Sequence, residues 1–136
     1  MNKFKGDPRL LGKKVLVVNE CSKFRFFIST AFTYVGANVV EAGCGHEMSQ
    51  RIWEENPDII LIDKEMPDMD SHLLMNNKET EHASVVITTF QKDACKLMSR
   101  EPLIAENLLI RPFSPEELLR KVTDVIDKKS KYEHNC

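Results

Sequence analysis

The 136-residue sequence lacks a long apolar run, a C-x-x-C pair and an excess of charge of either sign. No stretch approaches the ~20 apolar residues of a membrane span, and the polar start lacks the apolar core of a signal peptide. A net charge of -2 gives no electrostatic reason to expect nucleic-acid binding. We therefore expect a cytoplasmic protein that binds neither membranes nor nucleic acid directly.

The four cysteines, Cys21, Cys44, Cys95 and Cys136, are scattered along the chain. In a chain without an export signal they indicate reduced thiols, and they exclude a disulfide framework or a zinc site with paired ligands.

Five short apolar runs alternate with segments of helical periodicity, over a length that fits one domain. The runs are apolar on both faces, which predicts an α/β fold with a parallel sheet covered by helices on both sides. The pattern alone does not give the strand order. The predicted strands are residues 14–18, 38–41, 58–63, 84–89 and 108–110.

The helical segments carry start and stop signals of unequal strength. Ser22 is a candidate N-cap and Gly36 a stop for the first helix. The last helix has the strongest start, because Ser114 and Glu117 form a capping box around a proline. Methionine, phenylalanine and tryptophan residues at helical spacing, Trp53 among them, are interpreted as core. The other predicted helices cover residues 47–55, 71–79 and 92–100, and the one over 71–79 is poorly defined.

Three segments are expected along the chain: an N-terminal extension over residues 1–12, a domain over 13–128 and a tail over 129–136. The extension and the tail are polar and are expected to fray.

Polar residues follow four of the predicted strands. In an open parallel sheet, ligands bind beyond the carboxyl ends of the strands, so these residues are candidates for one site. Carboxylates suit a hard cation such as Mg²⁺, while a hydroxyl and a fixed cation can hold phosphoryl oxygens. Such a set suits acyl-phosphate chemistry on an aspartate. The candidates are Asn19, Glu20, Asp63, Thr88, Thr89 and Arg111.

The segment 60–70 contains Asp63, Met66, Pro67 and Asp70 in an arrangement that resembles the "D-x-x-M-P-x-M-D" signature of response-regulator receiver domains. The Arg-Pro-Phe sequence that begins at Arg111 resembles their "K-P-F". The resemblance covers about residues 13–128 and includes the chemotaxis response regulator.

The resemblance implies a flavodoxin-like sheet of five parallel strands in the order 2-1-3-4-5. It implies that Asp63 accepts a phosphoryl group from a histidine kinase or a phosphotransfer protein. It also implies Mg²⁺, held by Glu20, Asp63 and the backbone carbonyl of Glu65, with Asn19 acting through a metal-bound water. Thr89 is the preferred switch hydroxyl, because its spacing from Arg111 is that of the chemotaxis regulator, and Thr88 is the alternative.

Five positions depart from the family pattern. Asn19 and Glu20 stand where two acids, the second an aspartate, are usual. Arg111 replaces a lysine, and a planar guanidinium is not equivalent to a compact ammonium. Ser71 replaces a glycine, and Leu108 an aromatic residue that moves with the switch hydroxyl. These changes concern Mg²⁺ affinity and switching more than the fold.

Three functions are compatible with these residues. The first is a phosphorylated switch that catalyses only its own phosphorylation and dephosphorylation. It signals through protein contact on the surface formed by residues 92–100, 108–110 and 114–128. The second is a degenerate receiver that acts as a phosphorylation-independent adaptor. The third, ranked low, is a flavin-binding or small-molecule domain or a Mg²⁺-dependent phosphatase.

Overall fold

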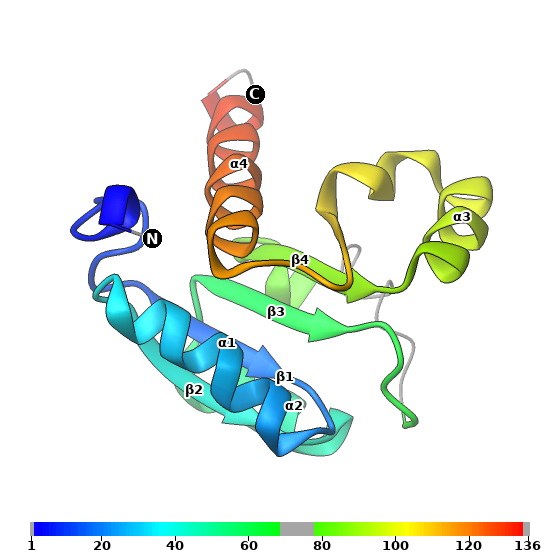
Figure 1. Cartoon of the computed structure of the whole chain (residues 1–136), viewed down its shortest axis with the longest axis horizontal. Coiled ribbons are helices and arrows are strands. Elements are labelled where there is room, and N and C mark those ends of the chain that lie inside the picture. Colours follow the sequence, from blue (N-terminus) through cyan, green and yellow to red (C-terminus); the bar gives the residue numbers. More distant parts are fainter. Residues whose placement is uncertain (1, 69–77, 135–136) are drawn as a thin grey trace.

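A computed structural model describes residues 2–68 and 78–134 of the chain. Its centre is a parallel sheet of five strands in the order β2-β1-β3-β4-β5, which confirms the order implied by the resemblance (Figure 1). The strands are β1 Lys14–Val18, β2 Asn38–Ala42, β3 Ile59–Asp63, β4 Ser84–Thr89 and β5 Leu108–Ile110.

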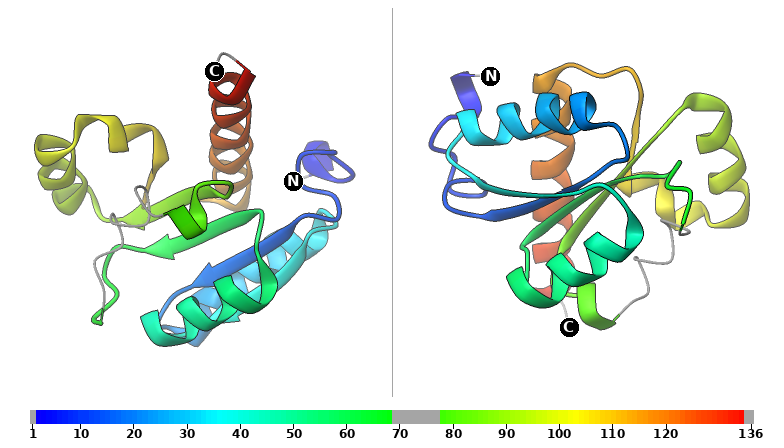
Figure 2. Two further views of the ribbon diagram at one scale, coloured as in Figure 1. Left: turned by 180° about the vertical axis from the view of Figure 1, so that it is seen from behind. Right: turned by 90° about the horizontal axis from the view of Figure 1, so that it is seen from below.

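Helices cover both faces of the sheet (Figure 2). Helices α1 and α4 share one hydrophobic cluster with the sheet, and α2 and α3 share a second cluster on the opposite face. The α-helices are α1 Ser22–Tyr34, α2 Gly45–Glu55, α3 Gln91–Arg100 and α4 Pro115–His134. The 3-10 helices are η1 Asn2–Phe4, η3 Lys78–Thr80 and η4 Pro102–Asn107.

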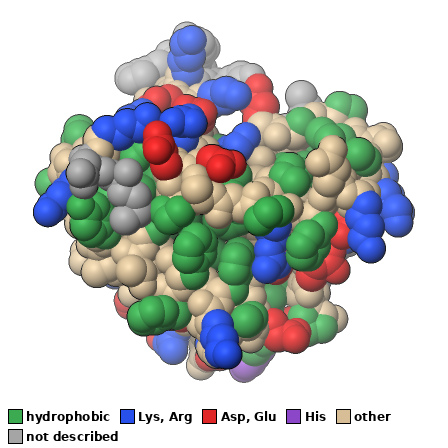
Figure 3. Space-filling view, viewed as in Figure 1, with side chains coloured by type: hydrophobic (Ala, Val, Ile, Leu, Met, Phe, Trp, Pro, Cys, Tyr) green, Lys and Arg blue, Asp and Glu red, His purple; other side chains and the backbone are tan. Residues whose placement is uncertain are grey.

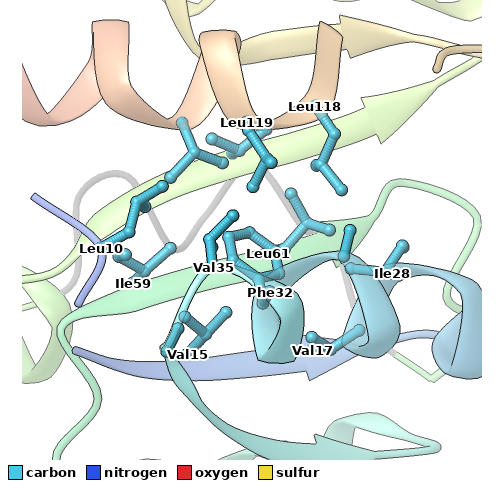
Figure 4. Close-up of a cluster of buried hydrophobic side chains, with 14 of the residues drawn as sticks. Leu10, Val15, Val17, Ile28, Phe32, Val35, Ile59, Leu61, Leu118 and Leu119 are labelled. Carbon is cyan, nitrogen blue, oxygen red and sulfur yellow. The ribbon is translucent and has the colours of Figure 1, made fainter. Parts of the chain in front are cut away.

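Strand β3 is buried along its whole length, as expected for an apolar strand between two helical layers. Its side chains alternate between the clusters, so Leu61 packs toward α1 and α4 and Ile62 toward α2 and α3. Figure 4 shows the first cluster, in which Phe32 and Leu118 lie between the sheet and the two helices. This packing fixes the end of β3, where Asp63 lies.

The N-terminal segment does not fray as the sequence led us to expect. Phe4 is 5% exposed and Leu10 is fully buried in the first cluster. Arg9 donates hydrogen bonds to Asp7 and to Asp127 of α4. The apolar residues of this segment are too few to show a periodicity, but they are enough to anchor it.

Other details of the sequence interpretation were wrong. Cys21, and not Ser22, is the N-cap of α1, and its side chain makes no capping hydrogen bond. Trp53 is 84% exposed, because α2 buries its neighbour Ile52 instead. Helix α4 runs to His134, although fraying was expected after residue 128.

The start of α4 agrees with the prediction. The Glu117 N–H donates to Ser114 Oγ at 3.1 Å, and the Ser114 N–H donates to Glu117 Oε1 at 3.4 Å. Most of the predicted helix 71–79, including Ser71, lies outside the described residues. In the part of the chain that is described, no helix is long and apolar enough to cross a membrane.

Candidate functional site

The predicted site residues meet at the edge of the sheet formed by the carboxyl ends of the strands, called here the carboxyl edge. Val18 of β1 pairs with Ile62 of β3, so Asn19 and Asp63 follow the two strands side by side. Asp63 in turn pairs with Thr88 of β4. The Arg111 N–H donates to the Thr89 carbonyl at 2.8 Å. The strand order therefore brings Asn19, Asp63, both threonines and Arg111 together.

Asp63 is a buried carboxylate, 6% exposed, with several donors around it. Its Oδ2 accepts from Asn19 Nδ2 and from Arg111 Nη1, both at 2.9 Å. Its Oδ1 accepts from the backbone N–H of Glu65 at 3.1 Å. A charge removed from water is tolerated only with such compensation, which here includes the guanidinium cation.

Asn19 is 3% exposed and its amide is fixed at both ends. The oxygen Oδ1 accepts from the Cys21 N–H at 2.8 Å, while Nδ2 donates to Asp63. Turning the amide over would place an NH₂ group against the Cys21 N–H and an oxygen against the carboxylate. The hydrogen bonds therefore assign the nitrogen to the Asp63 side.

Arg25 of α1 holds the backbone of the same loop. Its Nη1 donates to the Asn19 carbonyl at 2.5 Å, and its Nε donates to Glu41 of β2 at 3.0 Å. The loop between β1 and α1 is thus tied to α1 and to the neighbouring strand. The sequence interpretation missed Arg25, because an arginine on a helix gives no sign of which carbonyl it reaches.

The Arg111 guanidinium lies against two aromatic rings. Its Cζ is 4.0 Å from the ring centroid of Phe24 and 4.8 Å from that of Phe90. Phe24 also contacts Phe113 edge-on, with ring centroids 5.8 Å apart. A planar guanidinium stacks on aromatic faces better than an ammonium does, so these rings suit an arginine. The helical pattern marks Phe24 only as a core residue, and no sequence pattern singles out Phe90.

Thr88 and Thr89 are both buried at the end of β4. Strand alternation places Thr88 on the sheet face of Val86, toward α1 and α4, and Thr89 on the opposite face with Ile87. The Thr89 hydroxyl donates to the Phe90 carbonyl at 3.4 Å. The choice between the two threonines as a switch residue stays a prediction.

Glu65 contacts the start of α3. Glu65 is an exposed residue, and a hydrogen bond shared with Asp93, with a smaller effect of desolvation, raises the pKa of Glu65. Asp68 of the same loop accepts the Gly45 N–H with both carboxylate oxygens at 2.9 Å. Gly45 is the first residue of α2, so Asp68 stabilises the N-terminus of that helix.

The residues of the carboxyl edge do not fit Mg²⁺ in this arrangement. The ion requires near-octahedral oxygen ligands, and Asn19 turns an N–H donor toward Asp63 while its oxygen binds Cys21. A guanidinium contacts the same carboxylate oxygen, and Glu20 is exposed to solvent. Among the described residues, no group of three His, Cys, Asp or Glu side chains adds further ligands to this site.

Similar proteins are known for most of this chain. The model of the "Response regulator receiver domain" family matches residues 15–123. "Protein PilG" of Pseudomonas aeruginosa is 30% identical over 112 residues, covering 79% of this chain and 83% of that protein. "Probable chemotaxis protein CheY" of Rhizobium etli is 29% identical, with 77% of this chain and 85% of that protein covered.

Other relatives are longer. "Probable transcriptional regulator ycf27" of Porphyridium aerugineum is 23% identical, and the match covers 90% of this chain but 52% of that protein. This chain thus spans about half the length of the transcriptional regulators that it matches.

Solved structures share the fold. The chemotaxis response regulator CheY4 of Vibrio cholerae superposes with a TM-score of 0.73 at 24% identity, covering 84% of this chain and 98% of that chain. A receiver domain from Clostridium thermocellum gives a TM-score of 0.75 at 22% identity, covering 88% of this chain and 98% of that chain. The order of the strands and the family match over most of the chain lead to one conclusion: the chain belongs to the response regulator receiver domain family.

Proposed function

We propose that the chain is a phosphoryl-accepting receiver domain of a two-component pathway and that Asp63 is the acceptor. The observation that carries the proposal is the buried Asp63 carboxylate at the end of β3, contacted by the Arg111 guanidinium at 2.9 Å. Receiver domains are in general signalling modules and not enzymes. We accordingly propose that this chain catalyses only its own phosphorylation and dephosphorylation.

The proposed reaction transfers a phosphoryl group from a phosphohistidine on a kinase or phosphotransfer protein. An Asp63 carboxylate oxygen attacks phosphorus, the P–N bond breaks, and the imidazole keeps the electron pair and takes up a proton. An acyl phosphate on Asp63 results. The transition state spreads negative charge over three phosphoryl oxygens, and the Arg111 guanidinium beside Asp63 would offset part of it.

A protein donor must dock over the carboxyl edge. Phe26 and Phe27 of α1 are 72% and 37% exposed, and Phe90, which touches Arg111, is 44% exposed. Figure 3 shows hydrophobic side chains gathered between charged groups on the face that carries α1. These apolar groups on α1 and at the start of α3 support recognition of a protein, because exposed aromatic residues are common at interfaces.

The proposed output surface is formed by α3, β5 and α4. Thr89 shares a face of the sheet with Leu108 of β5, so a change at the hydroxyl could reach this surface. Leu108 is 5% exposed and packs in the cluster with α3 residues. The affinity of a partner protein that contacts α3, β5 and α4 would then depend on that change.

A phosphorylation-independent adaptor is the second candidate. The Asp63–Arg111 ion pair does not separate it from the first, because the same pair would stabilise a site that is never phosphorylated. It predicts that partner binding is the same for the wild type and for Asp63→Asn.

The test is treatment of the full chain with a small phosphodonor and Mg²⁺, followed by intact-mass measurement. We expect the addition of one phosphoryl group in the wild type and none in Asp63→Asn. Asp58→Asn is the matched control, because Asp58 precedes β3 at the other end of the strand and should leave labelling unchanged. Failure of the wild type to be labelled, by small donors or by a phosphotransfer protein, would contradict the proposal.

A further inference from the structure

We infer that the Asp63 site works without a divalent cation, with Asn19 and Arg111 together compensating the acceptor carboxylate. The inference deepens the proposed function, because it concerns how the same site balances its charge. It begins from the two donors that share Asp63 Oδ2, the Asn19 amide and the Arg111 guanidinium, both at 2.9 Å. A cation bound to that oxygen would have to displace them.

The Asn19 donor is held in place from three sides. Its Oδ1 binds the Cys21 N–H at 2.8 Å, its backbone N–H binds the Ala42 carbonyl at 3.1 Å, and Arg25 binds its carbonyl. To offer oxygen to a metal, the side chain would have to leave both Cys21 and Asp63. Each buried polar group left without a partner would cost free energy, so the donor orientation is the stable one.

The Arg111 cation is equally fixed. It lies 4.0 Å from the Phe24 ring and 4.8 Å from the Phe90 ring while it contacts Asp63. A guanidinium is always charged and weakly hydrated, so it keeps its charge in this half-buried position. The guanidinium thus already places a positive charge beside Asp63, so a second cation would gain less electrostatic free energy there.

The acidic character that would attract Mg²⁺ is also reduced. Asn19 contributes no charge, and Glu20 is exposed at the start of the loop. Mg²⁺ binds through carboxylates and dehydrates reluctantly, so one buried carboxylate beside a guanidinium is a poor site. A change of Asn19 to aspartate would reverse two of these features at once, by removing the N–H donor and adding a charge.

The first experiment titrates the full chain with MgCl₂ and follows backbone amide signals by NMR, with NaCl at matched ionic strength as the control. The Cys21 and Glu65 amides are the reporters, because they donate to Asn19 Oδ1 and Asp63 Oδ1. In the wild type we expect no saturable shift. In Asn19→Asp we expect saturable shifts, with an apparent affinity at least about tenfold above the upper limit that the wild-type titration sets.

The titration decides between clear outcomes. Saturable shifts of both reporters in the wild type at low millimolar Mg²⁺ would overturn the inference. No binding in either protein would support a metal-free site but overturn the role given to Asn19. The spectrum of Asn19→Asp also reports its folding, and if that variant does not fold, the wild-type titration decides the inference by itself.

The second experiment repeats phosphodonor labelling in excess EDTA and in excess Mg²⁺. Equal labelling in both would support the inference. Labelling only with Mg²⁺ would overturn it and leave the proposed function standing. Labelling under neither condition would contradict the proposed function, and the NMR titration would still show whether the site binds Mg²⁺.

Discussion

The two ends of the sheet carry similar charged groups in different surroundings. At the carboxyl edge, Asp63 is 6% exposed and shares one carboxylate oxygen between Asn19 and Arg111. At the opposite, amino edge, Arg9 reaches Asp127 at 2.7 Å, but the Asp127 side chain is 57% exposed. The bond lengths are alike, so the burial and not the geometry separates them.

This difference in burial predicts how well each end of the sheet tolerates a change of charge. Solvent-exposed ion pairs contribute about 0–1 kcal/mol, because water competes for both partners. A buried pair costs desolvation and becomes strongly unfavourable when one partner is lost. We therefore expect charge changes to be tolerated at the amino edge and costly at the carboxyl edge. The amino edge should depend instead on apolar packing.

The largest expected effect is that of Arg111→Gln. It leaves the buried Asp63 without its cation, and we expect a loss of about 3 kcal/mol in the free energy of unfolding. Urea denaturation followed by circular dichroism measures it. Fluorescence is less suitable, because Trp53, the single tryptophan, is 84% exposed.

Asp127→Asn is the counterpart at the amino edge, since it breaks an ion pair but leaves the Arg9–Asp7 contact. We expect a cost below about 1 kcal/mol. Equal losses in the two variants would contradict the contrast between the two ends.

The second prediction concerns apolar packing at the amino edge. Leu10 is fully buried, and Leu10→Ala should cost about 2–3 kcal/mol through lost burial and a residual cavity. Leu11→Ala is the control, because Leu11 is 55% exposed and should cost little. Denaturation of the two variants side by side would show whether residues 1–12 are part of the folded unit. If the Leu10 variant were as stable as the Leu11 variant, the segment would not be part of that unit.

The fold could be predicted because it depends on patterns that the sequence displays directly. Apolar runs such as residues 59–62, in alternation with helical segments, indicate buried strands of a parallel sheet, and the capping box at Ser114 marks a helix start. A parallel sheet then brings the residues after its strands to one edge. The location of Asp63 and Arg111 follows from those rules and from the family motif.

The chemistry of the site could not be predicted in the same way, because it depends on side-chain directions. Which atom of Asn19 faces Asp63 is decided by the Cys21 N–H, and no residue pattern records that contact. The aromatic contacts of Arg111 join three separate loops or helix starts. The prediction that Trp53 is a core residue was wrong for a related reason, because a helical pattern identifies the apolar face of a helix but not the width of that face.

A third prediction concerns the contact between the loop after β3 and the N-terminus of α2. Asp68→Ala removes a carboxylate that accepts the Gly45 N–H at the helix N-terminus. We expect a cost of about 1 kcal/mol by denaturation. Asp68→Asn should cost less, because its amide oxygen can still accept the hydrogen bond. A full loss in the asparagine variant would show that the charge, and not the hydrogen bond, is what stabilises α2.

The smallest expected effects are pH dependences of opposite sign at the two ends. A hydrogen bond from Arg9 lowers the pKa of Asp7, so its contribution to stability is present above the unfolded pKa and is lost as pH falls through the folded pKa. At the carboxyl edge, the hydrogen bond with Asp93 raises the pKa of Glu65. Its contribution is present below the unfolded pKa and is lost as pH rises through the folded value.

Denaturation across the acidic pH range should therefore separate the two variants Asp7→Asn and Glu65→Gln. Relative to the wild type, Asp7→Asn should lose stability above the ordinary carboxyl pKa and recover as pH falls. Glu65→Gln should instead gain as pH rises, by less than about 1 kcal/mol because Glu65 is exposed. Asp93→Asn should reduce the same dependence, because Asp93 is the largest cause of the raised pKa of Glu65. Parallel pH curves for Asp7→Asn and Glu65→Gln would contradict the opposite directions of the two pKa shifts.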